Sequence, residues 1–133
     1  MKHVALLITG SREGWTYEEF EEIILETYEP RDIGIMIFGC ARGIDTFAKE
    51  FCLKHDIYGY LFKADWDNQG KKAGILRNEC MAKFLEKKSH NYMISEVIAF
   101  RTDLSKGTTH MINYARELNL KVTIHDKSTF TFD

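Results

Sequence analysis

Two short stretches of the sequence combine glycine with arginine, and each follows an apolar run. They are Thr9-Gly10-Ser11-Arg12 and Gly39-Cys40-Ala41-Arg42-Gly43-Ile44-Asp45. Glycine lets backbone amides approach an anion closely, arginine offers a forked donor to phosphate oxygens, and a helix N-terminus adds a favourable dipole. Together these stretches favour binding of a phosphorylated ligand, although each glycine alone could simply make a tight turn.

Two later stretches carry other polar chemistry. They supply Asp65, Trp66, Asp67 and Gly70 in the first case, and Ser105, Lys106, Gly107, Thr108 and Thr109 in the second. Carboxylates can take part in acid–base catalysis, an indole can form a flat pocket wall, and hydroxyl groups next to a glycine can bind phosphate. Structural roles are the alternative, because aspartates are common in turns, a loop tryptophan can pack, a loop lysine can be solvated and hydroxyl groups cap helices.

Arg77 occupies an unusual position in a helical pattern. Between residues 73 and 85, apolar side chains recur at helical spacing, and Arg77 falls near the middle of the face that they form. A guanidinium on an inward face is costly to desolvate unless it meets an anion. We therefore expect Arg77 to point into a ligand site; the alternative is that it reaches past Phe84 to solvent or pairs with an internal carboxylate.

Strand and helix patterns alternate along the whole chain. Strands are predicted by apolar runs at 3–9, 33–38, 57–62, 95–100 and 120–125. Most of these runs are too apolar for a strand with one face exposed to solvent. Helical patterns lie at 17–28, 44–52, 73–85 and 111–118. This alternation predicts a doubly wound α/β fold with a mostly parallel sheet of about five strands and helices on both faces. The ending 128–132 could add a short edge strand.

In such a sheet, ligands bind outside the carboxyl ends of the strands. All four polar stretches are junctions between a predicted strand and a predicted helix. We therefore expect them to meet at one edge of the sheet and to form one ligand site.

Composition restricts the class of protein. The chain has 133 residues, 44% of them hydrophobic, and a formal net charge of −2, which suits one globular domain and disfavours general DNA coating or binding to an anionic membrane. No apolar stretch approaches the roughly 18 residues of a membrane span. The three cysteines and five scattered histidines lack metal-site spacing, so we expect free thiols, no metal, no membrane and a cytoplasmic location.

Neither of two strong nucleotide motifs is present. The chain contains no G-x-x-x-x-G-K-[ST] and no G-x-G-x-x-G. This weakens assignment as a nucleoside triphosphatase or as a dinucleotide oxidoreductase, and we expect no bound cofactor.

The order of the four junctions resembles the YspA-type branch of the SLOG superfamily of Rossmann-like nucleotide-binding proteins. The resemblance covers nearly the whole chain. It is most specific over 64–81, in A-D-W-D, Gly70, Ala73-Gly74, Arg77-Asn78 and Met81. The superfamily includes the Lonely Guy phosphoribohydrolases, DNA-processing protein A and sensors of nucleotide signals. The resemblance implies one nucleotide-binding domain over 1–133, with Gly74 and Asn78 among its ligand contacts.

The same resemblance implies a catalytic position for Arg77, which stands where the phosphoribohydrolases carry the arginine of their R-K-x-E-M segment. Their P-G-G-x-G-T-x-x-E loop is only partly matched. Gly107 and Thr108 correspond to its G-T, but the proline and two glycines are missing, and Met111 occupies the position of the glutamate. Cys40 also replaces a glycine of the second loop. N-glycosidic cleavage generally needs a carboxylate, for which Asp45, Asp65, Asp67 and Glu79 are candidates.

Three functions follow as hypotheses. The favoured one is binding of a nucleotide or nucleotide derivative, such as a nucleoside phosphate or an ADP-ribose-like molecule, by a sensor or sequestering protein. The enzyme alternative is a nucleoside-phosphate N-glycosidase. The third is a DNA-processing or interaction protein, which the acidic charge balance disfavours. Apolar helix faces and a β-rich edge permit a homodimer.

Overall fold

The computed structural model describes residues 2–103 and 105–128 of the protein. The edge strand expected over 128–132 lies, beyond Ser128, outside these residues. Five parallel strands form one sheet in the order β3-β2-β1-β4-β5. The strands are β1 (Val4–Gly10), β2 (Ile33–Phe38), β3 (Gly59–Leu61), β4 (Ile94–Thr102) and β5 (Lys121–Lys127).

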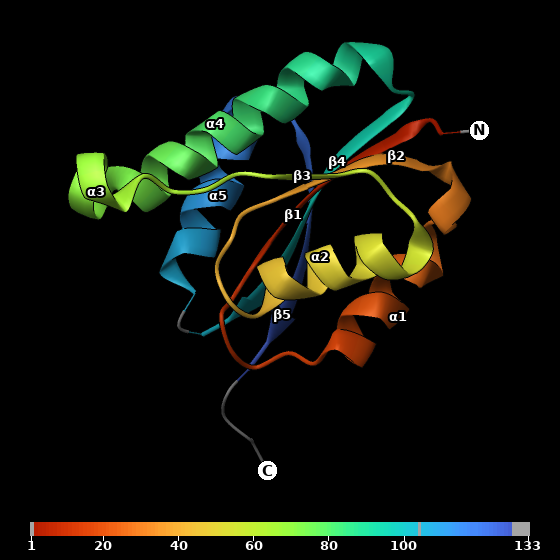
Figure 1. Ribbon diagram of the computed structural model, residues 1–133, viewed down its shortest axis with the longest axis horizontal. Helices are drawn as coiled ribbons and strands as arrows, with labels where there is room; N and C mark the ends of the chain where they lie inside the picture. The colour runs from red at the N-terminus through yellow and green to blue at the C-terminus, as the bar shows by residue number, and fades with distance from the viewer. Residues whose placement is uncertain (1, 104, 129–133) are drawn as a thin grey trace.

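Helices cover both faces of this sheet, with α1 and α2 on one side and α4 and α5 on the other (Figure 1). The helices are α1 (Tyr17–Thr27), α2 (Ile44–His55), α3 (Trp66–Gln69), α4 (Ala73–Lys88) and α5 (Lys106–Glu117), with 3₁₀ turns at Pro30–Asp32, Gly70–Lys72 and Ser89–Asn91. This arrangement confirms the predicted Rossmann-like doubly wound class. None of the helices in the described ranges combines the length and apolar character that crossing a membrane requires.

Two predicted elements differ from the structure. Strand β3 pairs only over Gly59–Leu61, which is shorter than the predicted run 57–62. Helix α5 begins at Lys106, ahead of the apolar pattern that starts at Met111. Its first turn is polar and faces a cavity, so hydrophobic periodicity could not mark where the helix begins.

The core has two layers because the sheet is buried from both sides. On one face, the ring of Phe20 in α1 lies 5.9 Å from the ring of Phe51 in α2 and 5.0 Å from that of Phe100 in β4. On the other face, Met81 and Met111 pack against the opposite side of β1. Strand β1 is therefore enclosed on both faces, which is why its sequence is apolar at successive positions.

The direction in which the chain winds changes beside β1. From β1 the chain proceeds to β2 and β3 on one side, and then crosses to β4 and β5 on the other. The two carboxyl ends at this change, Gly10 of β1 and Thr102 of β4, are followed by loops that lead to helices on opposite faces of the sheet. Such a switch point leaves a crevice between the diverging loops, where ligands bind in open α/β sheets.

Replacement of Phe20 by alanine tests the aromatic layer. Phe20 is 0% exposed, so Phe20→Ala should lower the free energy of unfolding by about 3–5 kcal/mol through lost burial and a cavity. The matched control is Leu53→Ala in α2, where the side chain is 76% exposed and the change should stay within about 0.5 kcal/mol. Urea unfolding measures both. Equal effects would contradict this packing.

Candidate functional site

A cavity of about 630 Å³ lies at the switch point, at the carboxyl ends of β1, β2 and β4. The first turns of α2 and α5 and one face of α4 complete its wall. The structure brings together there, from the residues predicted to bind ligand, Thr9, Gly10, Ser11, Arg12, Gly39, Ala41, Arg42, Asp45, Arg77, Asn78, Lys106, Gly107 and Thr108. Three of the four predicted junctions therefore meet at one edge of the sheet, and the ligand roles of their residues remain predictions.

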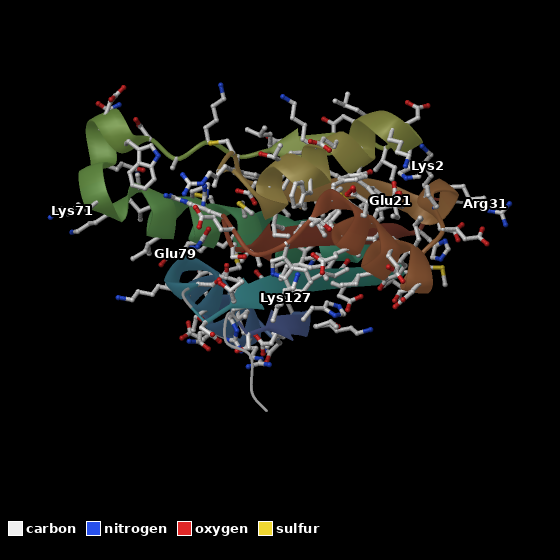
Figure 2. All side chains as sticks on the ribbon, turned by 90° about the horizontal axis from the view of Figure 1, so that it is seen from below. Lys2, Glu21, Arg31, Lys71, Glu79 and Lys127 are labelled. Carbon is white, nitrogen blue, oxygen red and sulfur yellow. The ribbon has the colours of Figure 1, made fainter. Side chains whose placement is uncertain are left out.

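The other predicted site residues lie outside this wall. Gly43 precedes α2 and lies against the backbone oxygens of Ser11 and Arg12, and the Thr109 hydroxyl donates to the backbone oxygen of Ser105, just before α5. Glu79 of α4 faces α5, with a carboxylate oxygen 4.0 Å from Nε2 of His110 (Figure 2). The remaining predicted site residues lie in or next to α3 or at the start of α4. They are Asp65, Trp66, Asp67, Gly70 and Gly74.

Five lining residues were not selected from the sequence as ligand contacts. They are Glu13, Gly14, Met81, Thr102 and Ser105. Glu13 and Gly14 directly continue the first glycine–arginine stretch, and that continuity is the signal that could have identified them. Ser105 belongs to the fourth junction and Thr102 precedes it by three residues, whereas Met81 follows from Arg77 only once the helix face is known.

The loop after β1 is seated on the N-terminus of α2. The N–H of Ser11 donates to the Phe100 oxygen at 2.9 Å, and the N–H of Ile44 donates to the Ser11 oxygen at 3.2 Å. A Cβ on Gly43 would lie 2.5 Å from the Arg12 oxygen, and the residue has a φ of +80°. Glycine is therefore required at this position by both the close approach and the backbone angle.

Two helices present uncapped N-termini to the cavity. Helix α1 has a capping box, in which Thr16 accepts from the Glu19 N–H and Glu19 accepts from the Thr16 N–H. In contrast, no side chain among the described residues caps α2 or α5. The Ser105 hydroxyl, for which capping was the structural alternative, instead accepts from the Thr102 N–H at 3.0 Å. The first turns of α2 and α5 thus direct their positive ends toward the cavity, although the Ile44 N–H at the start of α2 already donates to the Ser11 oxygen.

Arg77 and Asp45 converge over Gly39. A Cβ on Gly39 would lie 2.7 Å from Oδ2 of Asp45 and 2.9 Å from Nη1 of Arg77. The Arg77 Nη2 donates to Oδ1 of Asn78 at 3.3 Å, whereas its buried Nε has no hydrogen-bond partner within the described part of the chain. A buried donor without a partner is costly, so this guanidinium is a group that a bound acceptor would satisfy.

The carboxylate of Asp45 is the buried acid of the cavity. Its residue is 8% exposed, and Oδ2 accepts from the Ala41 N–H at 3.0 Å. Burial raises the pKa of Asp45, although the Ala41 N–H and the Arg77 guanidinium both act to lower it. The burial effect is the larger one, so keeping Asp45 ionised costs free energy. A hydrogen bond donated by a ligand would reduce this cost.

Further charges lie at the rim. Arg12, Arg42 and Lys106 are exposed, and Arg42 pairs with Glu13 at 2.9 Å. This pair contributes little stability because both side chains are well solvated. It can therefore open at little cost, which makes the Arg42 guanidinium available to an anion.

Two further observations concern chemistry that the sequence raised. Within residues 2–103 and 105–128, no three or more His, Cys, Asp and Glu side chains are grouped so that they could hold a metal ion. The Met111 side chain is fully buried in the core layer that contains Leu7 and Val97, rather than in the cavity wall.

Comparison with known proteins adds one similarity. The Gene 61 protein of Mycobacterium phage D29 is 28% identical to this chain over 123 residues, which cover 88% of this chain and 92% of that protein. No family model matches the chain, and no solved structure matches it. The similarity extends over nearly the whole of both proteins, and the name of the phage protein specifies no activity.

The buried position of Asp45 predicts a pH dependence of stability. Because its pKa is raised above the ordinary 3.8, the folded protein binds this proton more tightly than the unfolded chain. Its contribution is fully present below the unfolded pKa and is lost as pH rises through the folded pKa. As pH rises from the unfolded pKa through the folded pKa of Asp45, the free energy of unfolding of Asp45→Asn should therefore rise relative to that of the native protein.

Urea unfolding of both proteins at a series of pH values measures this difference. The control is Asp56→Asn, at an exposed residue that ends α2 outside the cavity. Stability curves for Asp45→Asn and the native protein that run parallel through the acid range would contradict the assignment.

Proposed function

We propose that the protein binds a nucleotide or nucleotide-derived ligand, of the nucleoside-phosphate or ADP-ribose type, and acts as a sensor or sequestering protein. The observation that carries the proposal is that the first turns of α2 and α5 meet in one cavity beside Arg77, and that no described side chain caps either helix or accepts from the Arg77 Nε. Its volume of about 630 Å³ is in the usual range for a small-molecule site.

A phosphate group fits this arrangement chemically. It offers several acceptor oxygens, which suit helix N–H groups and a guanidinium that is already positioned. The space beside Gly107 is also open, since a Cβ there would lie within 4 Å of no described residue beyond its chain neighbours and its own helix backbone. An anion can therefore approach the backbone at the start of α5 directly.

The buried acid favours a sugar phosphate over a simple anion. A site for inorganic phosphate alone gains nothing from Asp45, whose charge repels the ligand. Ribose hydroxyl groups, however, donate hydrogen bonds, which a carboxylate accepts. A ligand that carries both an anion and hydroxyl donors uses the cations and Asp45 together.

The proposal also includes a cytoplasmic location and a homodimer. Two cysteines, Cys40 and Cys80, are free and exposed, which suits a reducing compartment. Strand β3 forms one edge of the sheet, and its Tyr60 and Leu61 are exposed. Pairing of this edge with a second copy would cover apolar side chains.

Ligand binding should stabilise the fold and should depend on Arg77. At about 100 times its dissociation constant, a bound nucleoside phosphate should add roughly 2.7 kcal/mol to the free energy of unfolding. Arg77→Ala should weaken binding by about 1.5–3 kcal/mol, because a charge-assisted hydrogen bond is lost. Thermal shift against nucleoside monophosphates and ADP-ribose, followed by calorimetry, measures both effects.

The matched control is Arg31→Ala. The Arg31 side chain is 80% exposed, and Figure 2 shows Arg31 and Lys71 at opposite ends of the molecule. Arg31 belongs to the turn before β2, so it lies at the amino edge of the sheet, away from the cavity. If no phosphorylated ribose compound shifts the melting temperature, or if Arg77→Ala and Arg31→Ala bind alike, the proposal is wrong.

The N-glycosidase alternative rests on one observation, the carboxylate of Asp45 inside the cavity near Arg77. Because its Oδ2 already accepts from Ala41, and Met111 is buried in the core, we expect the protein to bind nucleoside monophosphates with little or no release of free base. Chromatography of the reaction mixture measures release. Rapid release that Asp45→Asn abolishes would make the protein an enzyme rather than a binder.

A further inference from the structure

Trp66 is a large aromatic side chain that remains half exposed outside the cavity wall. It is 52% exposed and begins the four-residue helix α3. Gly70 ends this helix with a φ of 57°, and its N–H donates to the Trp66 oxygen. That backbone angle favours glycine, and it turns the chain so that α3 lies against the start of α4. The backbone around Gly70 thus places Trp66 next to the start of α4.

The indole rests on Gly74 of α4. A Cβ on Gly74 would lie 3.4 Å from Cη2 of Trp66, so glycine leaves the ring close to the helix. Gly74 shares one helix face with Arg77, Asn78 and Met81, because these residues are three, four and seven positions apart. The last three line the cavity. Trp66 therefore lies just beyond the outer end of this wall, next to the helix face that forms it.

Helix α4 sets the distance between this ring and the proposed phosphate site. Nδ2 of Asn78 donates to the Gly107 oxygen at 3.2 Å, which fixes Asn78 beside the first turn of α5. Gly74 lies four residues earlier, or about 6 Å along the helix axis at a rise of about 1.5 Å per residue. About one turn of α4 therefore separates Asn78 from the residue on which the indole rests, a spacing on the scale of a ribose.

From this geometry we propose that the exposed face of Trp66 stacks on the heterocyclic base of a nucleoside phosphate whose phosphate lies at the N-termini of α2 and α5. This inference rests on the proposed function and assigns the orientation of the ligand, with phosphate inside and base outside. An aromatic face accepts any base, so the site requires a base without reading its identity by hydrogen bonds.

The test compares two ligands that differ only in the base. Calorimetry with ribose phosphate and with a nucleoside monophosphate should show tighter binding of the latter to the native protein. Trp66→Ala should weaken binding of the nucleoside monophosphate by about 5- to 150-fold, the range that base–aromatic stacking energies imply. It should leave binding of ribose phosphate unchanged. Trp66→Phe should retain part of the difference. Ile75→Ala, at an exposed neighbour of Gly74, is the matched control.

Fluorescence gives a second, independent measurement. The chain has two tryptophans, and Trp15 packs edge-on against Phe100 at 5.3 Å. In Trp15→Phe the remaining emission comes from Trp66, so a nucleoside monophosphate should quench it and ribose phosphate should not.

Each alternative outcome is distinct. Equal affinity of the native protein for the two ligands, or unchanged binding of the nucleoside monophosphate by Trp66→Ala, overturns the base position while leaving the proposed function intact. If Trp66→Ala weakens binding of both ligands equally, Trp66 has a structural role and does not contact the base. If the native protein binds neither ligand, the proposed function fails, and this inference fails with it.

Discussion

Burial of β1 on both faces is the constraint on which the rest of the structure depends. A strand enclosed in this way needs helices above and below it, and parallel neighbours can be reached only by crossover connections. The crossovers bring successive carboxyl ends to one edge of the sheet, and the change of direction beside β1 separates the loops there. The cavity is thus a consequence of how the apolar sheet is covered, and the polar junction residues then determine what it can hold.

The chemistry of the cavity comes from groups whose hydrogen bonding the described residues leave incomplete. Capping satisfies the start of α1 but not the starts of α2 and α5, and the Nε of Arg77 is buried without an acceptor in the described part of the chain. Asp45 is an acid that its burial makes costly to ionise. Donors and an acid in one cavity suit a ligand that carries both charge and hydroxyl groups.

Much of the fold could be predicted because parallel strands and amphipathic helices have distinct periods. The short helix α3 could not, since four residues contain too little of a helical period to detect. The positions of Thr9 and Gly39 at one sheet edge followed from the alternation of elements. The contact of Trp66 with Gly74 did not, because it depends on the backbone angle of Gly70 and on tertiary packing.

The two helices whose N-termini meet in the cavity belong to different layers, since α2 packs on one face of the sheet and α5 on the other. The proposed anion, bound between them, would connect the two layers of the core. Local opening of either layer would release the anion, so its binding would suppress local opening of both layers together. Amide protection against hydrogen exchange would then spread through the whole domain, far beyond the residues in contact with the ligand.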